Sequence, residues 1–210
     1  MVIAVLIILA YLIGSVPTAV WVSKKAFGID IREHGSGNAG ATNTFRILGS
    51  KAGSMVMLID MLKGFLAVKL ALFSPFAWTS EPFVNLQIFL GLASVLGHIF
   101  PVWADFRGGK GIATLFGMIL SIQPLVAMCL VGVFILMLFL TRYVSLSSIS
   151  ASVAFPLLIL FIFHAHELSY QLFAVSTAFL VILTHYKNIN RLLSGNESKV
   201  PLFRKRRFNR

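Results

Sequence analysis

Residues 112–140 read IATLFGMILSIQPLVAMCLVGVFILMLFL, an apolar stretch without a charged side chain. The stretch is longer than the roughly 20 residues that one helix needs to cross a bilayer core of about 30 Å. Gln123 and Pro124 stand inside it, and a proline favours a break because it removes a helical hydrogen bond. The stretch is therefore either one long helix or a short helix before Gln123 and a longer helix after Pro124.

The distribution of Lys and Arg decides between these two readings. With one helix here, the C-terminal cations would lie outside the cell, against the rule that basic loops stay inside; they are Lys187, Arg191, Lys199 and the cluster at 204–207. With two helices, every basic loop lies on the same side. We therefore predict two segments, of which the short one needs surrounding protein or a thinner bilayer.

Other apolar segments stand on both sides of this stretch: Val2–Ser23, Gly53–Pro75, Leu86–Trp103, Ser150–Phe163 and Ser169–Thr184. We expect polar connections at Lys24–Ala52 and at Phe76–Asn85. Because Lys24 and Lys25 follow the first segment, it is read as a retained helix with its N-terminus outside and not as a cleavable signal. The sequence thus predicts an all-α integral membrane protein with seven transmembrane helices, one of them short, and a cytoplasmic C-terminus.

Composition supports a membrane protein. Of the residues, 58% are hydrophobic and 12% are charged, and the mean hydropathy is +0.88. A soluble domain has about 45–50% apolar and about 25% charged residues, so lipid is the expected solvent. The single cysteine, Cys129, excludes a disulfide within the chain and a metal-binding cysteine pair. We expect one domain over residues 1–210 and no metal.

The formal net charge is +11, from 18 Lys and Arg against 7 Asp and Glu. These cations lie between apolar segments and in a tail. That pattern favours membrane lipids with anionic headgroups, or anionic substrates, over nucleic acid. We expect no nucleic-acid partner, and we expect the basic tail at 204–210 to rest on anionic headgroups.

Three polar segments lie on the predicted inner face, and the first is HGSGNAGATNTFR at 34–46. Its glycines let the backbone turn N–H groups toward an anion. Hydrogen-bonding side chains stand between them, namely Ser36, Asn38, Thr42 and Asn43. Arg46 adds a planar guanidinium that suits phosphate.

The second polar segment is GHIFPVWADFRGGKG at 97–111, in which Gly108, Gly109 and Gly111 flank Lys110. It is not a Walker A loop, because Ala104 stands where the first glycine belongs and Gly111 replaces Ser or Thr. ATP or GTP hydrolysis is therefore not supported. The segment still resembles a phosphate cradle that leads into a helix N-terminus.

The third polar segment is HYKNINRLLSGNE at 185–197. On a helix, His185 and Asn188 are three residues apart and share a face, with Arg191 one turn further on. A histidine at a membrane surface is suited to acid–base work or to binding phosphate.

In this order, the three segments resemble the bacterial acyl-phosphate-dependent glycerol-3-phosphate acyltransferases, which are small inner-membrane enzymes. The resemblance covers essentially the whole chain. The matching residues are Ser36-Gly37-Asn38-x-Gly40-Ala41-Thr42-Asn43, then Gly97-His98-x-Phe100-Pro101 through Gly108-Gly109-Lys110-Gly111, then His185-x-x-Asn188-Ile189-x-Arg191. Ala39 is a departure, because many members carry Pro there.

The resemblance implies transfer of a fatty acyl group from acyl phosphate to the sn-1 hydroxyl of glycerol 3-phosphate, the first step of phospholipid synthesis. It implies no cofactor, an active site on the cytoplasmic face of the bacterial inner membrane, and a functional link to the enzyme that supplies acyl phosphate. The first loop, with Gly37, Asn38, Gly40, Thr42 and Asn43, would receive acyl phosphate, and Ser36 and Asn188 would place the acceptor hydroxyl. Arg46, Lys110, Ser148 and His185 would hold glycerol 3-phosphate, with Gly108 and Gly109 beside it.

Some roles stay open at this stage. We favour a binding role for Ser36 over a nucleophilic one, because no His and Asp pair stands beside it in sequence. The base is either His185 or a phosphate oxygen of the substrate. Asp60 and Lys63 fall inside a predicted span, where a charge costs about 2.5–3.5 kcal/mol, and they either pair with each other or line a polar cavity.

Two other functions compete with the acyltransferase. A transporter for a small phosphorylated metabolite would also use basic loops, but it needs polar groups near the midplane that both sides can reach. A structural lipid-binding subunit would leave the three loops rich in glycine and asparagine without a role.

Overall fold

The computed structural model describes residues 1–165 and 167–200, and within these ranges every regular element is a helix. The α-helices are α1 (Val2–Gly14), α2 (Thr18–Phe27), α3 (Ala41–Lys69), α4 (Glu81–Ile99), α5 (Ile112–Ile122), α6 (Pro124–Thr141), α7 (Val144–Leu157), α8 (Leu168–Thr184) and α9 (Tyr186–Leu193). Short 3₁₀ turns lie at Ile31–Glu33, Leu70–Phe73 and Val102–Ala104, and α7 continues as a π-helical turn at Leu158–Ile162. The predicted all-α class is confirmed for the described residues.

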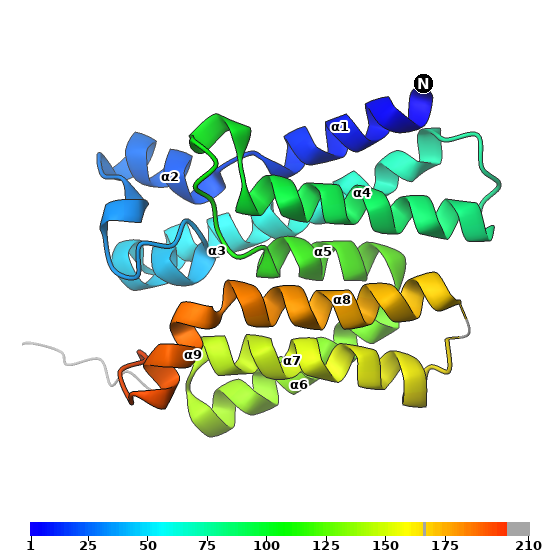
Figure 1. The fold of residues 1–210 in the computed structure, drawn as a ribbon. Helices are drawn as coiled ribbons and strands as arrows, with labels where there is room; N and C mark the ends of the chain where they lie inside the picture. Colours follow the sequence, from blue (N-terminus) through cyan, green and yellow to red (C-terminus); the bar gives the residue numbers. More distant parts are fainter. Residues whose placement is uncertain (166, 201–210) are drawn as a thin grey trace, which may run out of the picture.

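The long helices run side by side in two groups (Figure 1). In the first group α1, α3, α4 and α5 pack on one another, and in the second α7 packs on both α6 and α8. Contacts of α5 with α6 and of α4 with α8 join the two groups. At one end of the bundle lie α2, α9 and the segments that follow α2 and α4. The polar segments of the sequence therefore meet at one end of the molecule.

The outer surface of the bundle is strongly apolar. The largest core cluster contains side chains from each of the helices α3 through α8 and includes the aromatic residues Phe155, Tyr170 and Phe173. In contrast, α6 buries only Val126, Ala127 and Leu130. A helix that is apolar all round and exposes most of its side chains is suited to contact with lipid.

The predicted break at Gln123–Pro124 is confirmed. Helix α5 ends at Ile122 and α6 begins at Pro124. Proline suits the first helical position, because the N–H that it lacks would have no partner there in any case. Among the described residues, four helical segments are long and apolar enough to cross a membrane, and α1 with α2 counts as one of them; there are five if α8 and α9, bent by 61°, form one span. The number of seven spans and the orientation remain predictions.

Several predicted boundaries were wrong. The first segment is not one continuous helix, because the chain leaves the helical path between Gly14 and Thr18, at Pro17. The connection predicted at Lys24–Ala52 contains the end of α2 and the first turns of α3, which is kinked at Gly49 (φ 84°). The connection predicted at Phe76–Asn85 ends early, because the Ser80 side chain caps α4 by accepting a hydrogen bond from the Phe83 N–H.

Helices α3 and α5 approach closely through two glycines. A Cβ atom built on Gly64 of α3 would lie 2.1 Å from the Thr114 carbonyl oxygen of α5. One built on Gly117 of α5 would lie 1.9 Å from the Met61 carbonyl oxygen of α3. Small residues allow such backbone contact between membrane helices. This contact fixes α5, and Lys110 lies two residues before that helix.

Candidate active site

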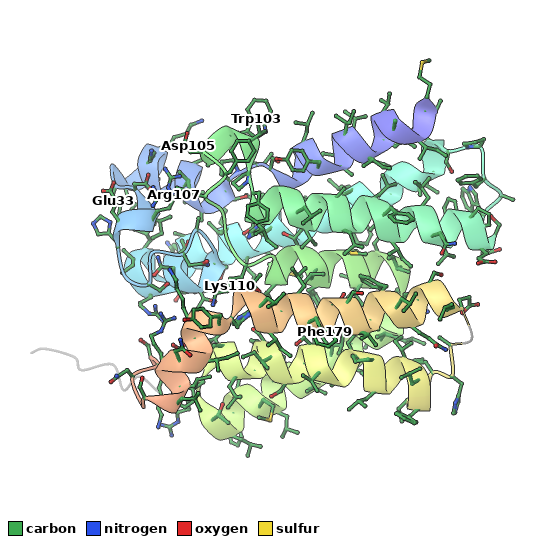
Figure 2. All side chains as sticks on the ribbon, viewed as in Figure 1. Glu33, Trp103, Asp105, Arg107, Lys110 and Phe179 are labelled. Carbon is green, nitrogen blue, oxygen red and sulfur yellow. The ribbon has the colours of Figure 1, made fainter. Side chains whose placement is uncertain are left out.

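Lys110 and Asn188 join the second and third polar segments. The Nζ of Lys110 donates a hydrogen bond to Oδ1 of Asn188, which lies on α9. Figure 2 shows Lys110 between the two groups of helices, near the polar end of the bundle. The side chain of Asn188 is buried, and that of Lys110 is half-buried. The structure thus brings together two residues that the sequence proposed for catalysis.

Glu197 organises the third polar segment. One carboxylate oxygen accepts hydrogen bonds from Ser145 Oγ (2.8 Å) and Asn188 Nδ2 (2.7 Å), and the other accepts from Arg191 Nε (2.7 Å). Burial would raise the pKa of Glu197, but the hydrogen bonds from Arg191, Asn188 and Ser145 lower it overall. The carboxylate therefore orients Asn188 toward Lys110 and offsets part of the positive charge.

The environment of Lys110 is cationic. Burial lowers its pKa to about 8; the charge of Glu197 acts to raise it, and the charges of Arg191 and Arg46 act to lower it. Arg46 is exposed on the first turns of α3, so it belongs to the same electrostatic environment. Three cations near one place form a site suited to phosphate groups.

His185 lies at the bend between α8 and α9, directly before α9, and the Asn188 N–H on the first turn of α9 donates to its carbonyl (2.8 Å). His185 is 3% exposed, and its Nδ1 lies 2.8 Å from the Val181 carbonyl oxygen. Since a carbonyl only accepts, Nδ1 carries the proton and donates it. In the neutral ring Nε2 is then left as a hydrogen-bond acceptor.

Asn43 shapes the first polar segment from within. It is 1% exposed on α3, its Oδ1 accepts from the Ser36 N–H (3.0 Å), and its Nδ2 donates to the carbonyls of Ile31 (3.1 Å) and His34 (2.9 Å). Its amide is thus engaged by the loop, and it shapes the backbone that the sequence analysis expects to receive acyl phosphate.

The other predicted residues of this loop differ in exposure. Ser36 and Gly37 are exposed at its tip, where the Gly37 N–H donates to the His34 carbonyl (3.1 Å). Asn38 is half-buried, and Gly40 is buried at the residue before α3. Thr42 is exposed on the first turn of α3. The Ser36 hydroxyl and the Thr42 side chain are therefore open to a substrate.

Gly108 and Gly109 allow close packing and do not offer free N–H groups. The Gly108 N–H donates to the Ile99 carbonyl and the Gly109 N–H to the His98 carbonyl, each at 3.1 Å. A Cβ on Gly108 would lie 2.0 Å from the His98 carbonyl oxygen. Neither N–H group is therefore free to bind a phosphate, because both donate to carbonyls at the end of α4.

Ser148 is also placed differently from the prediction. Its hydroxyl is buried on α7 and donates to the Val144 carbonyl of the same helix (3.0 Å). One turn earlier, Ser145 is the serine that reaches the site, through Glu197.

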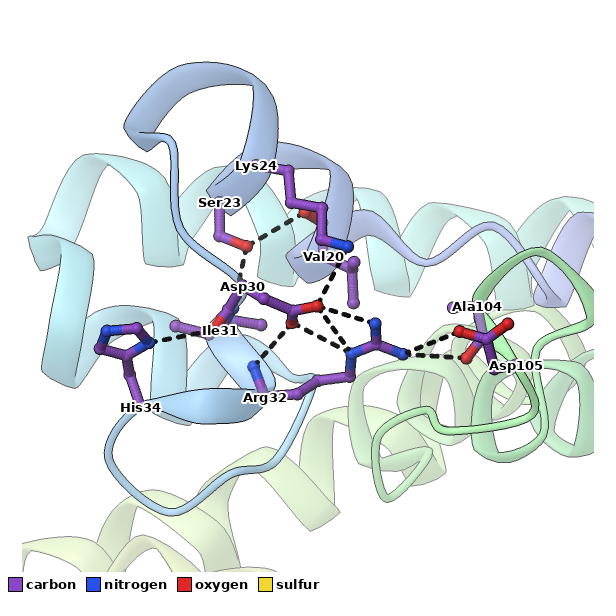
Figure 3. A network of polar contacts seen from close by, with 9 residues as sticks. All are labelled: Val20, Ser23, Lys24, Asp30, Ile31, Arg32, His34, Ala104 and Asp105. Atoms are coloured by element: carbon purple, nitrogen blue, oxygen red, sulfur yellow. Dashed lines mark hydrogen bonds and ion pairs between the residues drawn. The ribbon is translucent and has the colours of Figure 1, made fainter.

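Arg32, on the turn just before the first polar segment, contacts the second polar segment, a contact that sequence reasoning did not predict (Figure 3). Its Nη2 lies 2.7 Å from Oδ2 of Asp30, and its Nη1 donates to the Ala104 carbonyl (3.0 Å). Lys24 lies 3.1 Å from the same carboxylate. Hydrogen bonds from Arg32 and Lys24 hold the pKa of Asp30 well below its usual range, although burial opposes this. The Arg32 guanidinium, oriented by Asp30, therefore ties the two loops together through the Ala104 carbonyl.

Metal ligands do not gather in this region. Within residues 1–165 and 167–200, no group of three or more His, Cys, Asp or Glu side chains is placed to hold a metal ion.

Comparison with known proteins identifies the family. The family model described as glycerol-3-phosphate acyltransferase matches residues 4–195. The chain belongs to this family. The family predicted from the three polar segments is thus confirmed.

Members of the glycerol-3-phosphate acyltransferase family are similar over nearly the full length. A glycerol-3-phosphate acyltransferase from Bacillus velezensis is 46% identical, over 97% of this chain and all of the relative. One from Fusobacterium nucleatum is 44% identical, over 92% of this chain and 95% of the relative.

A solved structure supports the fold. A crystal structure of an integral membrane glycerol 3-phosphate acyltransferase, in its glycerol 3-phosphate form, has a TM-score of 0.84 and 39% identity, over 94% of this chain and 95% of that chain. Its lysophosphatidic acid form has a TM-score of 0.81 and the same identity. This chain is therefore an integral membrane protein of the same fold.

Proposed function

We propose that this chain transfers a fatty acyl group from acyl phosphate to the sn-1 hydroxyl of glycerol 3-phosphate, which gives 1-acyl-glycerol 3-phosphate and phosphate. The observation that carries the proposal is the hydrogen-bonded chain from Lys110 through Asn188 and Glu197 to Arg191 at one end of an apolar bundle, with the charge of Arg46 acting on Lys110. Such a site can hold two anionic groups, one on a lipid donor in the membrane and one on a soluble acceptor. The solved relative in its glycerol 3-phosphate form supports the acceptor, and the resemblance of the polar segments supports the donor.

The reaction needs little covalent help from the protein. Acyl phosphate is a mixed anhydride, so phosphate is already a good leaving group. The acceptor oxygen attacks the acyl carbonyl carbon, a new ester C–O bond forms, and the C–O bond to phosphate breaks. The protein therefore acts mainly by bringing two anions together and offsetting their charge. We assign the offsetting charge to Arg46 and Lys110.

The acceptor hydroxyl must lose its proton as the ester forms. Nε2 of His185 can accept it if Nδ1 keeps its hydrogen bond to Val181, and a phosphate oxygen of either substrate is the other acceptor. In both routes Ser36 binds and orients the substrate and forms no acyl intermediate. Asn188, which Lys110 and Glu197 hold from two sides, then places the hydroxyl.

We propose seven spans, with the N-terminus outside and the polar end of the bundle in the bacterial cytoplasm. Counting α5 and the kinked α3 as spans, although neither meets the length and hydropathy test alone, gives this number. The Lys and Arg residues of the described loops gather at the polar end, which supports its cytoplasmic placement. There the enzyme would meet soluble glycerol 3-phosphate and the product would enter phospholipid synthesis. The basic tail at 204–210 lies outside the described residues.

Phosphate release tests the proposal. Purified protein in detergent receives palmitoyl phosphate, with and without glycerol 3-phosphate. We expect release of phosphate only when the acceptor is present, in step with formation of the lysolipid. Folded protein that releases no phosphate would contradict the proposal, and uptake of glycerol 3-phosphate by vesicles would then support the transporter.

A further inference from the structure

A buried charged cluster lies inside the bundle, next to its polar end, and has no part in the mechanism described so far. It consists of Asp60 and Lys63 on α3, His98 near the end of α4, and Thr18 at the start of α2. Asp60 is 1% exposed, Lys63 is 5% exposed and His98 is 7% exposed. Three helices therefore direct ionisable or polar side chains to one enclosed place.

Asp60 is the centre of this cluster. Its Oδ1 lies 2.9 Å from Lys63 Nζ, accepts a hydrogen bond from Thr18 Oγ1 (3.0 Å), and lies 3.6 Å from His98 Nδ1. Lys63 also donates to the Val16 carbonyl (3.0 Å), which lies in the break between α1 and α2 and accepts a second hydrogen bond from the Thr18 N–H (3.0 Å). The pairing predicted for Asp60 and Lys63 is present, and the break between α1 and α2 supplies a further partner.

Stability alone does not account for these charges. Placing a charge inside a membrane-spanning segment is unfavourable, and ionisable residues there are usually functional. A buried ion pair can often be replaced by apolar residues of similar volume without loss of stability. In addition, His98 Nδ1 is buried and makes no hydrogen bond within the described residues. The cluster is therefore expected to serve a neighbouring part of the molecule.

That neighbouring part is the glycine-rich turn before α5. The His98 carbonyl accepts the Gly109 N–H at 3.1 Å. A Cβ on Gly109 would lie 2.3 Å from His98 Nε2, so the imidazole ring rests directly against this glycine. The next residue is Lys110, whose ammonium contacts Asn188. The ring of His98 thus stands between the Asp60 carboxylate and the backbone that carries Lys110.

We propose that Asp60, Lys63 and His98 are positioning residues that set the place of residues 108–110, and through them the Lys110 ammonium, for glycerol 3-phosphate. Lys63 and Thr18 orient the carboxylate, the carboxylate attracts the imidazole across 3.6 Å without a hydrogen bond, and the imidazole supports Gly109. The cluster contacts neither substrate. This inference rests on the proposed function, because its readout is the binding of glycerol 3-phosphate during acyl transfer.

The test is steady-state kinetics of the double variant Asp60→Asn/Lys63→Met. The variant removes both charges together, so neither is left unpaired in the bundle. We expect the KM for glycerol 3-phosphate to rise at least about tenfold, the KM for palmitoyl phosphate to stay within about twofold, and the unfolding temperature in detergent to change little. Lys69→Met is the matched control, because Lys69 is a cation of the same helix that lies over the Phe65 ring and outside the cluster. It should leave both KM values unchanged.

A second variant, His98→Gln, keeps a polar nitrogen near the position of Nε2 but loses the ring, and it should raise the same KM selectively. The proposal is overturned if both variants fold and keep the wild-type KM for glycerol 3-phosphate, or if both KM values rise together with loss of thermal stability. Failure of both variants to fold would also overturn it, because the cluster would then be needed for stability. An inactive wild type would instead contradict the proposed function.

Discussion

Lys110 joins the second and third polar segments, because its half-buried side chain donates a hydrogen bond to Asn188. Its positive charge can offset the charge of a phosphate only while the amine is protonated. Arg46 contributes a second, exposed cation to the same environment. The first predictions therefore concern these two side chains.

Removal of either cation should slow acyl transfer strongly. Lys110→Met or Arg46→Ala should each lower kcat/KM by about 10²–10³-fold, the effect typical of losing one charge-stabilising donor. Arg107→Ala is the control, because Arg107 is an exposed cation of the same loop and should matter less than threefold. Kinetics with palmitoyl phosphate as donor measure the effect. Turnover near that of the wild type in folded Lys110→Met would remove Lys110 from the site.

The pH dependence should report Lys110. Its pKa is about 8, so the amine is charged below that pH and becomes neutral as the pH rises through it. We expect kcat/KM for glycerol 3-phosphate to fall above about pH 8. Phosphate monoesters titrate near pH 6, so this fall belongs to the protein. The fall in kcat should come at a higher pH than the fall in kcat/KM, because a bound phosphate raises the pKa of Lys110. The Lys110→Met variant should lose this step, and an unchanged profile would assign it to another group.

At the residue scale, sequence motifs were a better guide to which side chains lie near the candidate active site than to what each of them contacts. Lys110 and Asn188 meet as proposed, because cations and amides in glycine-rich segments are recognisable from residue type. The role of Glu197 was missed, although a lone carboxylate among cations was a usable signal. That the N–H groups of Gly108 and Gly109 already donate to carbonyls at the end of α4 could not be predicted, because residue type does not show which backbone groups are paired.

At the scale of elements, the packing of α5 against α3 sets the position of the turn that carries Lys110. Gly117→Ala should destabilise the protein by about 1–3 kcal/mol, because the added methyl group meets the Met61 carbonyl and overpacks the contact. Gly132→Ala on α6 is the matched control, since a Cβ there meets nothing within 4 Å. Thermal unfolding in detergent compares the two. Equal stability of both variants would show that α3 and α5 separate without cost.

Helix boundaries were predictable where a proline interrupts a long apolar stretch and the distribution of Lys and Arg in the loops also requires two helices, as at Gln123–Pro124. Pro17 is a similar signal inside the first segment, but that segment has the length of a single span and was therefore read as one helix. The first turns of α3 were missed because they begin with Ala-Thr-Asn-Thr at 41–44, small or polar residues that also suit a loop. Tertiary contacts of Asn43 with the loop before it stabilise this helix start.

At the scale of the whole molecule, the account depends on which side of the membrane holds the polar end. Cys129 is first replaced by Ser, and single cysteines are then introduced as Thr79→Cys at one end of the bundle and Ser194→Cys at the other. A membrane-impermeant maleimide applied to intact spheroplasts should label the first variant and not the second until the membrane is opened. Labelling of the Ser194→Cys variant in intact spheroplasts would reverse the proposed orientation.

The central claim is direct acyl transfer from acyl phosphate to glycerol 3-phosphate, and product analysis tests it most directly. Purified protein in lipid vesicles receives isotope-labelled glycerol 3-phosphate with palmitoyl phosphate or, separately, with palmitoyl-CoA, and mass spectrometry follows labelled lysolipid. We predict 1-palmitoyl-glycerol 3-phosphate from palmitoyl phosphate alone, with one phosphate released for each lysolipid formed. Lysolipid formed from palmitoyl-CoA but not from palmitoyl phosphate would contradict the account.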